Sequence, residues 1–108
     1  MGENKSNIET LTLEYCDITD AGVAVIAPIK SLNWLMISSR ESKIGDKSAE
    51  VLAKTKLTHL DLHSHNLTGK GAKFFLNNTR LTTLNLAGNK ISESGNVNVN
   101  NSAYLSFS

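Results

Sequence analysis

Three residues with chemically active side chains alternate in one short segment: His59, Asp61 and His63. Alternate side chains of a β-strand point to the same face, about 6–7 Å apart. Imidazole and carboxylate groups in this arrangement could converge on zinc, which takes nitrogen and oxygen ligands at about 2.0–2.2 Å. No fourth ligand is evident nearby, since Glu14 belongs to a strand two places away. We therefore expect solvated polar side chains here and no bound metal.

The remaining residues give no pattern typical of catalysis. The chain has no Gly-x-Ser-x-Gly motif, no phosphate-binding loop and no cysteine–histidine pair at a spacing that suggests a nucleophile. Its one cysteine, Cys16, excludes an intramolecular disulfide. The sequence therefore predicts a protein that is not an enzyme and that uses no cofactor.

Composition and charge restrict the class of partner. The 108 residues include 11 Lys and Arg against 10 Asp and Glu, which gives a formal net charge of +1. Nucleic acids and anionic membranes usually bind to a strongly basic surface. No apolar run approaches the roughly 18 residues of a membrane helix. We expect a protein partner, no nucleic acid and no insertion into a membrane.

An internal repeat organises the chain. Four segments share the pattern L-x-x-L-x-L, with Ile at two of its positions, and they span residues 8–13, 32–37, 57–62 and 81–86. Their starts are 24, 25 and 24 residues apart. Three of them continue alike, with a turn residue, an aliphatic residue and a glycine at fixed offsets. These are Cys16, Ile18 and Gly22; His65, Leu67 and Gly71; and Asn89, Ile91 and Gly95. Because His65 occupies the turn position, we expect it to be a structural hydrogen-bonding residue and not a metal ligand.

With these motifs the chain resembles leucine-rich repeat proteins of the ribonuclease-inhibitor-like, helix-bearing subtype. Residues 11–22, L-T-L-E-Y-C-D-I-T-D-A-G, are especially similar to the cysteine-containing consensus of that family. The resemblance covers about residues 8–95. It implies an α/β solenoid of about four units, with a parallel sheet on the concave face and helices on the convex face. Such an array buries its apolar faces by stacking its units.

The repeats divide residues 1–108, a single domain, into successive parts. A polar lead at 1–7 precedes repeats at 8–31, 32–56, 57–80 and 81–95, and residues 96–108 form an irregular end or a truncated fifth repeat. Within that last part residues 103–107 read as a strand, and Leu105 lies where the fifth unit would begin, 24 residues after Leu81. Aligning Ile44 of the second unit with Ile18 and Leu67 requires two extra positions in the turn at residues 38–43, which predicts a bulged, exposed loop.

Helices are expected after each of the first three strands. Apolar residues recur there at helical spacing, as in Val23, Ile26 and Ala27; Ala49, Leu52 and Ala53; and Ala72, Phe75 and Leu76. Asp20 and Asp46 are expected to cap the N-termini of the first two helices. Pro28 is expected to close the first helix or to bend it.

The residues between the leucines should face outward on the concave side of the sheet. The middle two strands then present Trp34, Met36, His59, Asp61 and His63. Trp34 should neighbour His59, and Met36 should neighbour Asp61. An exposed tryptophan among polar groups is typical of a binding hot spot, so we expect these five residues to contact a partner. The alternative is that Trp34 only covers the sheet.

The sequence favours a binding module over other classes. The resemblance extends to bacterial leucine-rich repeat effectors that act on host proteins, and to cytosolic adaptors that select substrates for ubiquitin ligases. The Lys- and Asn-rich, Pro-poor composition favours the effector. We expect a location in the cytoplasm, or secretion into a host cell without a signal peptide. The alternatives are a fragment of a larger adaptor and a self-associating module, since an open end of the solenoid could pair in a homodimer.

Overall fold

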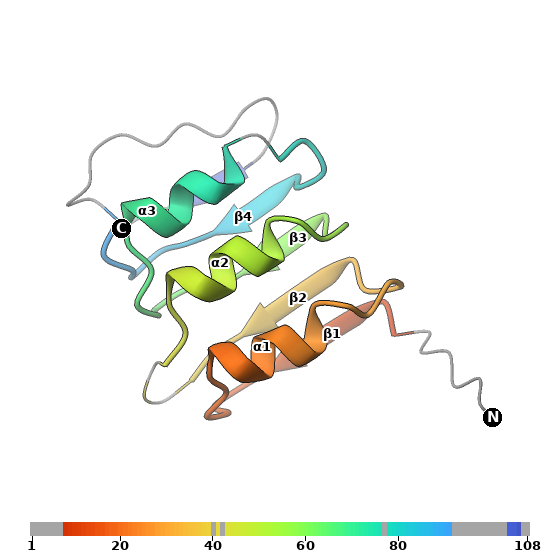
Figure 1. The fold of residues 1–108 in the computed structure, drawn as a ribbon, viewed down its shortest axis with the longest axis horizontal. Helices are drawn as coiled ribbons and strands as arrows, with labels where there is room; N and C mark the ends of the chain where they lie inside the picture. Colours follow the sequence, from red (N-terminus) through yellow and green to blue (C-terminus); the bar gives the residue numbers. More distant parts are fainter. Residues whose placement is uncertain (1–7, 40, 42, 77, 92–103, 107–108) are drawn as a thin grey trace.

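The computed structural model describes residues 8–39, 41, 43–76, 78–91 and 104–106. Its strands form one parallel sheet in the order β1-β2-β3-β4-β5 (Figure 1). The strands are β1 (Thr10–Leu13), β2 (Trp34–Ile37), β3 (His59–Asp61), β4 (Thr83–Asn85) and β5 (Tyr104–Ser106). Sequential strands are neighbours throughout, as expected of a solenoid in which each repeat contacts the next.

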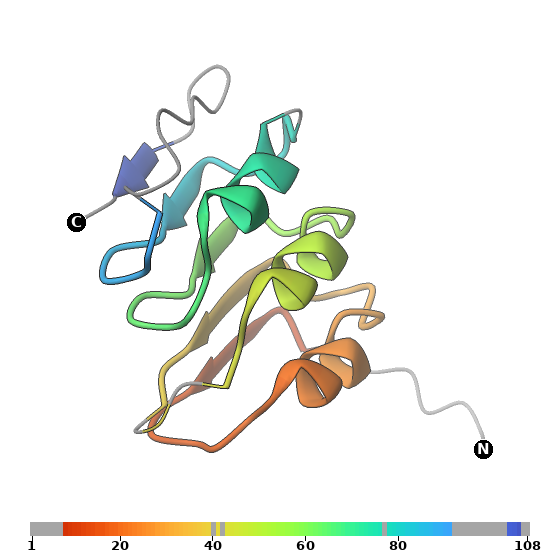
Figure 2. The ribbon, with the colours of Figure 1, turned by 60° about the vertical axis from the view of Figure 1, so that its left-hand side comes forward.

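Helices connect the first four strands and cover one face of the sheet (Figure 2). They are α1 (Asp20–Ile26), α2 (Asp46–Leu52), α3 (Gly69–Ala72) and the 3-10 turn η1 (Lys73–Phe75). The three predicted helices are thus confirmed, and Pro28 lies just beyond the end of α1 as expected. We call the sheet face opposite the helices the concave face.

The core lies between the sheet and the helices. The leucines of successive repeats pair across the sheet in one row, Leu11 with Leu35, Leu35 with Leu60 and Leu60 with Leu84. Helix residues close the core from the other side, and Phe75 is its largest fully buried side chain. The core includes Leu35, Ile37, Leu60, Leu62, Leu84, Leu86, Val23, Ala49, Leu52, Ala72 and Phe75. The alternating apolar residues of the strands and the apolar residues at helical spacing therefore lie in one common core.

The two predicted helix caps are wrong. Asp20 and Asp46 are the first residues of α1 and α2, and neither helix has a side-chain cap. Each carboxylate instead reaches the next repeat. Asp20 accepts hydrogen bonds from the Gly45 amide and the Ser48 hydroxyl. Asp46 accepts from the amide and the hydroxyl of Thr68, at 2.8 and 2.6 Å. Each aspartate joins its repeat to the next one, because its carboxylate lies within hydrogen-bonding distance of the start of the following helix.

The end of the chain also differs from expectation. The predicted strand is present as β5, but Leu105 pairs with Leu84 and does not occupy the position of Leu81. The fifth strand is therefore displaced by three residues from the predicted register. The register is set by pairing with β4, which places Leu105 beside Leu84 although the connection between these two strands is shorter than in earlier repeats. Gly95 and the expected irregular segment at 96–101 lie outside the described residues.

The second repeat keeps its core despite its longer turn. Ile44 is fully buried, as the alignment with Ile18 and Leu67 predicts. The bulge itself is only partly described, because residues 40 and 42 lie outside the described part.

Candidate functional site

The register of the sheet brings the predicted contact residues together. Trp34 pairs with His59, and Met36 pairs with Asp61, as the sequence predicts. All four are half-buried on the concave face. His63 follows directly after β3 and contacts Asp61. The part that these five residues play in binding a partner stays a prediction.

A shallow hollow lies in the middle of the concave face. Its outward-facing lining is Trp34, His59, Asp61, Thr83 and Asn85. The hollow measures about 140 Å³, well below the roughly 300–1,000 Å³ of a small-molecule pocket. It can take one side chain of a partner but cannot enclose a cofactor.

Thr83 and Asn85 extend the site by one strand beyond the sequence prediction. They lie on β4 in register with His59 and Asp61. Their outward direction was readable from the leucine pattern, but neither residue type is a typical hot-spot residue. Asn85 is recognised as part of the site only in the structure, because its role depends on its hydrogen bond to the Asp61 carboxylate on the neighbouring strand.

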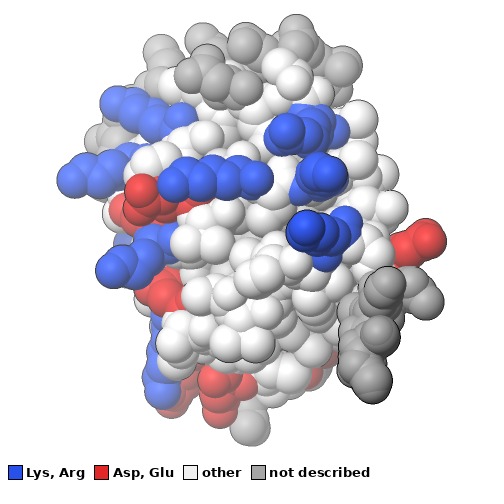
Figure 3. Space-filling model, turned by 45° about the vertical axis from the view of Figure 1, so that its right-hand side comes forward, with Lys and Arg blue, Asp and Glu red and all other residues white. Residues whose placement is uncertain are grey.

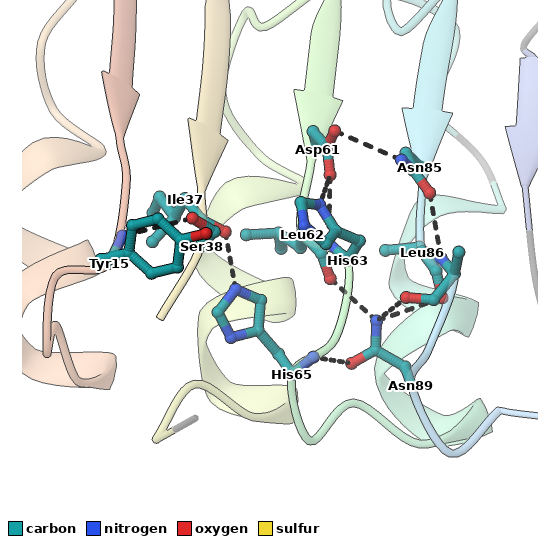
Figure 4. Close-up of polar contacts among 11 residues, drawn as sticks. Tyr15, Ile37, Ser38, Asp61, Leu62, His63, His65, Asn85, Leu86 and Asn89 are labelled. Atoms are coloured by element: carbon teal, nitrogen blue, oxygen red, sulfur yellow. Dashed lines mark hydrogen bonds and ion pairs between the residues drawn. The ribbon is translucent and has the colours of Figure 1, made fainter. Parts of the chain in front are cut away.

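A hydrogen-bond network centred on Asp61 crosses two repeats (Figure 4). Asp61 Oδ1 accepts from the amide of His63 at 3.1 Å and lies 2.6 Å from His63 Nδ1. Asp61 Oδ2 accepts from Asn85 Nδ2 at 3.2 Å, and Asn85 Oδ1 accepts from the Ala87 amide at 3.0 Å. An ionised carboxylate only accepts, so the network assigns a proton to His63 Nδ1. Asp61 and His63 remain 29% and 37% exposed, so a partner can reach them.

His59 takes no part in this network. Its Nδ1 lies 2.9 Å from Thr58 Oγ1, whose hydroxyl donates to the Asn33 carbonyl at 3.1 Å. The hydroxyl has one proton, so His59 Nδ1 donates to Thr58. In the described part of the chain, no group of three His, Cys, Asp or Glu side chains lies where it could hold a metal ion. The convergence of His59, Asp61 and His63 that a metal site needs is not formed.

The turn residues after the strands fix neighbouring repeats to each other. Buried His65 donates from Nε2 to the Ile37 carbonyl of the preceding repeat at 2.7 Å. Asn89 donates to the Leu62 and Leu86 carbonyls and accepts from the amides of His65 and Leu67. The structural role predicted for His65 is confirmed. Burial lowers the pKa of His65 below its ordinary value of 6.5, against an opposing effect of the Ile37 hydrogen bond.

One exposed aromatic residue was missed by the sequence analysis. Tyr15 is 71% exposed and has a φ of 55°. Ser64 and Gly88 occupy the same position in later repeats with φ values of 61° and 76°. A left-handed conformation costs a residue other than glycine about 1 kcal/mol. The turn of the repeat therefore holds an aromatic ring at the edge of the concave face against a backbone preference.

Comparison with protein families agrees with this architecture. The fold is that of a protein built from stacked strand–turn–helix repeats. The Leucine Rich repeat family matches residues 4–27, 53–76 and 77–95, which together exceed half of the chain. The chain therefore belongs to the leucine-rich repeat family. The unmatched stretch between the first two matches contains β2 and the longer turn that follows it.

Leucine-rich repeat domains generally mediate protein–protein interaction and are generally non-catalytic. A comparison with curated proteins finds no match. Among the described residues, no helix has the length and apolar character needed to span a membrane.

Proposed function

We propose that this protein is a non-catalytic module that binds a partner protein through its concave face. The contact residues are Trp34, Met36, His59, Asp61 and His63. The observation that carries the proposal is the juxtaposition of half-exposed apolar side chains with an ordered polar network on one rigid sheet.

The arrangement suits protein recognition energetically. Trp34 and Met36 offer apolar area that a partner can remove from water, which supplies affinity. Asp61 is already held by His63 and Asn85, so binding orders few additional rotamers. The ordered carboxylate then gives orientation and specificity, while the hollow beside Trp34 receives a side chain.

A paired capture experiment tests the proposal. Wild-type protein and a Trp34→Ala/Asp61→Ala variant are immobilised, and captured proteins are identified by mass spectrometry. A Lys47→Ala/Glu50→Ala variant serves as the control, because both residues are exposed in α2 on the opposite side of the sheet. The partner should be lost by the concave-face variant alone, with circular dichroism showing that all proteins are folded. Equal retention by both variants would contradict a concave-face site.

We further propose that the partner is a host protein and that the chain acts as a bacterial effector, delivered into the host cytoplasm. The Lys- and Asn-rich, Pro-poor composition supports this origin. The α-helical connections after β1, β2 and β3 support the ribonuclease-inhibitor-like subtype. Capture from host and bacterial lysates in parallel distinguishes the origins, since a specific bacterial partner would contradict an effector.

Self-association is the second candidate function. Ile8, Tyr15 and Val25 are exposed in the first repeat, at 44%, 71% and 77%. Among the described strands β1 has a neighbour on one side only, and such an edge can pair with another copy. Light scattering during gel filtration tests this candidate. A dimer that a Val25→Asp substitution dissociates would support it, and a monomer across micromolar concentrations would exclude it.

A further inference from the structure

A second surface lies away from the concave face, at the edge of the sheet where the strands begin. The turns that follow α1 and α2 enclose a hollow of about 340 Å³ there. Ala27, Pro28 and Ile29 line it with apolar atoms, and Lys30, Lys54 and Lys56 line it with cations. We call this surface the basic hollow.

The positive charge of the basic hollow is not neutralised locally. All three lysines are exposed, and none forms an ion pair with an Asp or Glu among the described residues. Arg80 extends the cationic surface into the third repeat, because its Nη1 donates to the Thr55 carbonyl at 3.3 Å. Figure 3 shows Lys and Arg side chains in a column on this side of the molecule, surrounded by uncharged atoms.

The repeat itself explains this column. Lys30, Lys56 and Arg80 each lie one or two residues before the first leucine of the next repeat. Parallel strands stack about 4.8 Å apart, so cations at this position of successive repeats form a row. A near-neutral chain with a net charge of +1 thereby gains a strongly basic edge.

We propose that the basic hollow binds an acidic segment of a partner protein in which an aliphatic side chain lies between carboxylates. The aliphatic group contacts Ala27, Pro28 and Ile29, and the carboxylates pair with Lys30, Lys54, Lys56 and Arg80. Single exposed ion pairs contribute little, so affinity requires several carboxylates together with the apolar contact. This surface is separate from the five residues of the concave face.

The lining favours protein over nucleic acid. Proteins that bind single strands usually stack bases on aromatic side chains, and the lining of the basic hollow contains none. A phosphate backbone would also leave the apolar atoms of Ala27, Pro28 and Ile29 unused. The combination of apolar lining and cationic surroundings complements a peptide that carries both kinds of group.

The test uses a fluorescein-labelled peptide of repeated Glu-Glu-Leu and measures its anisotropy with the full chain. Three other probes are compared: the same peptide with Gln for Glu, the same with Ser for Leu, and single-stranded DNA of equal charge. The Lys54→Glu/Lys56→Glu variant removes the site. The Lys47→Glu/Lys70→Glu variant changes the net charge equally at exposed positions in α2 and α3.

The acidic peptide should bind saturably, and the Gln and Ser peptides and the Lys54→Glu/Lys56→Glu variant should each lose at least about tenfold in affinity. The control variant should stay within about twofold. Equal losses in both variants, or absence of saturation, would overturn the proposal. DNA that binds as tightly as the peptide would also overturn it, as would a Ser peptide that binds like the original.

Discussion

Gly71 tests how the repeats are joined. It lies buried in α3, and a β-carbon at this position would lie 2.1 Å from Asp46 Oδ1 and 2.8 Å from Asp46 Cγ. The Gly71→Ala substitution therefore pushes the Asp46 carboxylate away from Thr68, whose amide and hydroxyl it binds. We expect the substitution to separate the second repeat from the third at the helix start.

The expected loss of unfolding free energy follows from two opposing contributions. Hydrogen bonds to a charged group contribute about 1.5–3 kcal/mol each, and the displaced carboxylate weakens two of them. Replacing a helical glycine by alanine increases the unfolding free energy by about 0.5–1 kcal/mol. The net loss for Gly71→Ala is then about 2–4 kcal/mol of unfolding free energy. That is a large part of the roughly 5–15 kcal/mol of a natural domain.

Asp46→Ala provides the second side of a double-mutant cycle. Without the carboxylate, the nearest remaining atom is the Cα of residue 46, 3.2 Å from the new methyl group, and a small shift accommodates this contact. Gly71→Ala should then cost less than about 0.5 kcal/mol, or even stabilise, so the coupling energy should exceed about 1.5 kcal/mol. Urea unfolding followed by fluorescence of Trp34, the one tryptophan, measures all four proteins. Additive losses would refute the argument that the carboxylate is the obstacle.

Four further substitutions test how the repeats are held together. His65→Asn should make the protein less sensitive to low pH. Because the pKa of His65 is lowered in the folded state, its contribution to wild-type stability is fully present above about pH 6.5 and is lost as the pH falls toward the folded pKa. Urea midpoints of the two proteins that shift in parallel with pH would contradict this. Asn89→Ala should lower the unfolding free energy by about 2–4 kcal/mol, because it removes hydrogen-bond partners from backbone groups of two repeats. A melting temperature within a degree of wild type would be inconsistent with that role. Phe75→Ala should lower the unfolding free energy by about 3–5 kcal/mol. Phe74 is 40% exposed, so Phe74→Ala should lower it by less than about 1 kcal/mol. Equal losses would show that the buried and the exposed phenylalanine are wrongly assigned.

The sequence predicted what depends on periodicity. Leucines at fixed offsets determine which side chains face the helices, and that alternation also placed Trp34 beside His59 and Met36 beside Asp61. These pairings needed only the strand period and equal repeat spacing. The same reasoning correctly treated His65 as a structural residue, because it occupies the position of Asn89 in the following repeat.

Features that depend on distances between repeats could not be predicted in this way. Asp20 and Asp46 have the residue type of a helix cap, but helix starts in the next repeat offer closer donors. The register of Leu105 was wrong because the spacing of earlier repeats was carried into a shorter connection. The partnership of Asp61 with Asn85 arises from side-chain orientation across two strands, which residue types alone do not specify.

The strand period separates the residues that stabilise the fold from those that we propose to bind a partner. Inward residues such as Leu60 carry the core, and the turn residues His65 and Asn89 bind backbone groups of neighbouring repeats. Outward residues such as Trp34 carry neither the buried core nor the backbone contacts between repeats, so substitutions there should affect folding less than substitutions of Leu60 or Asn89. Because the Asp61 network spans two repeats, substitutions there should nevertheless alter orientation at the surface. If the concave face binds the partner as proposed, a variant of that face should lose binding while it remains folded, with a smaller loss of unfolding free energy than a core variant such as Phe75→Ala.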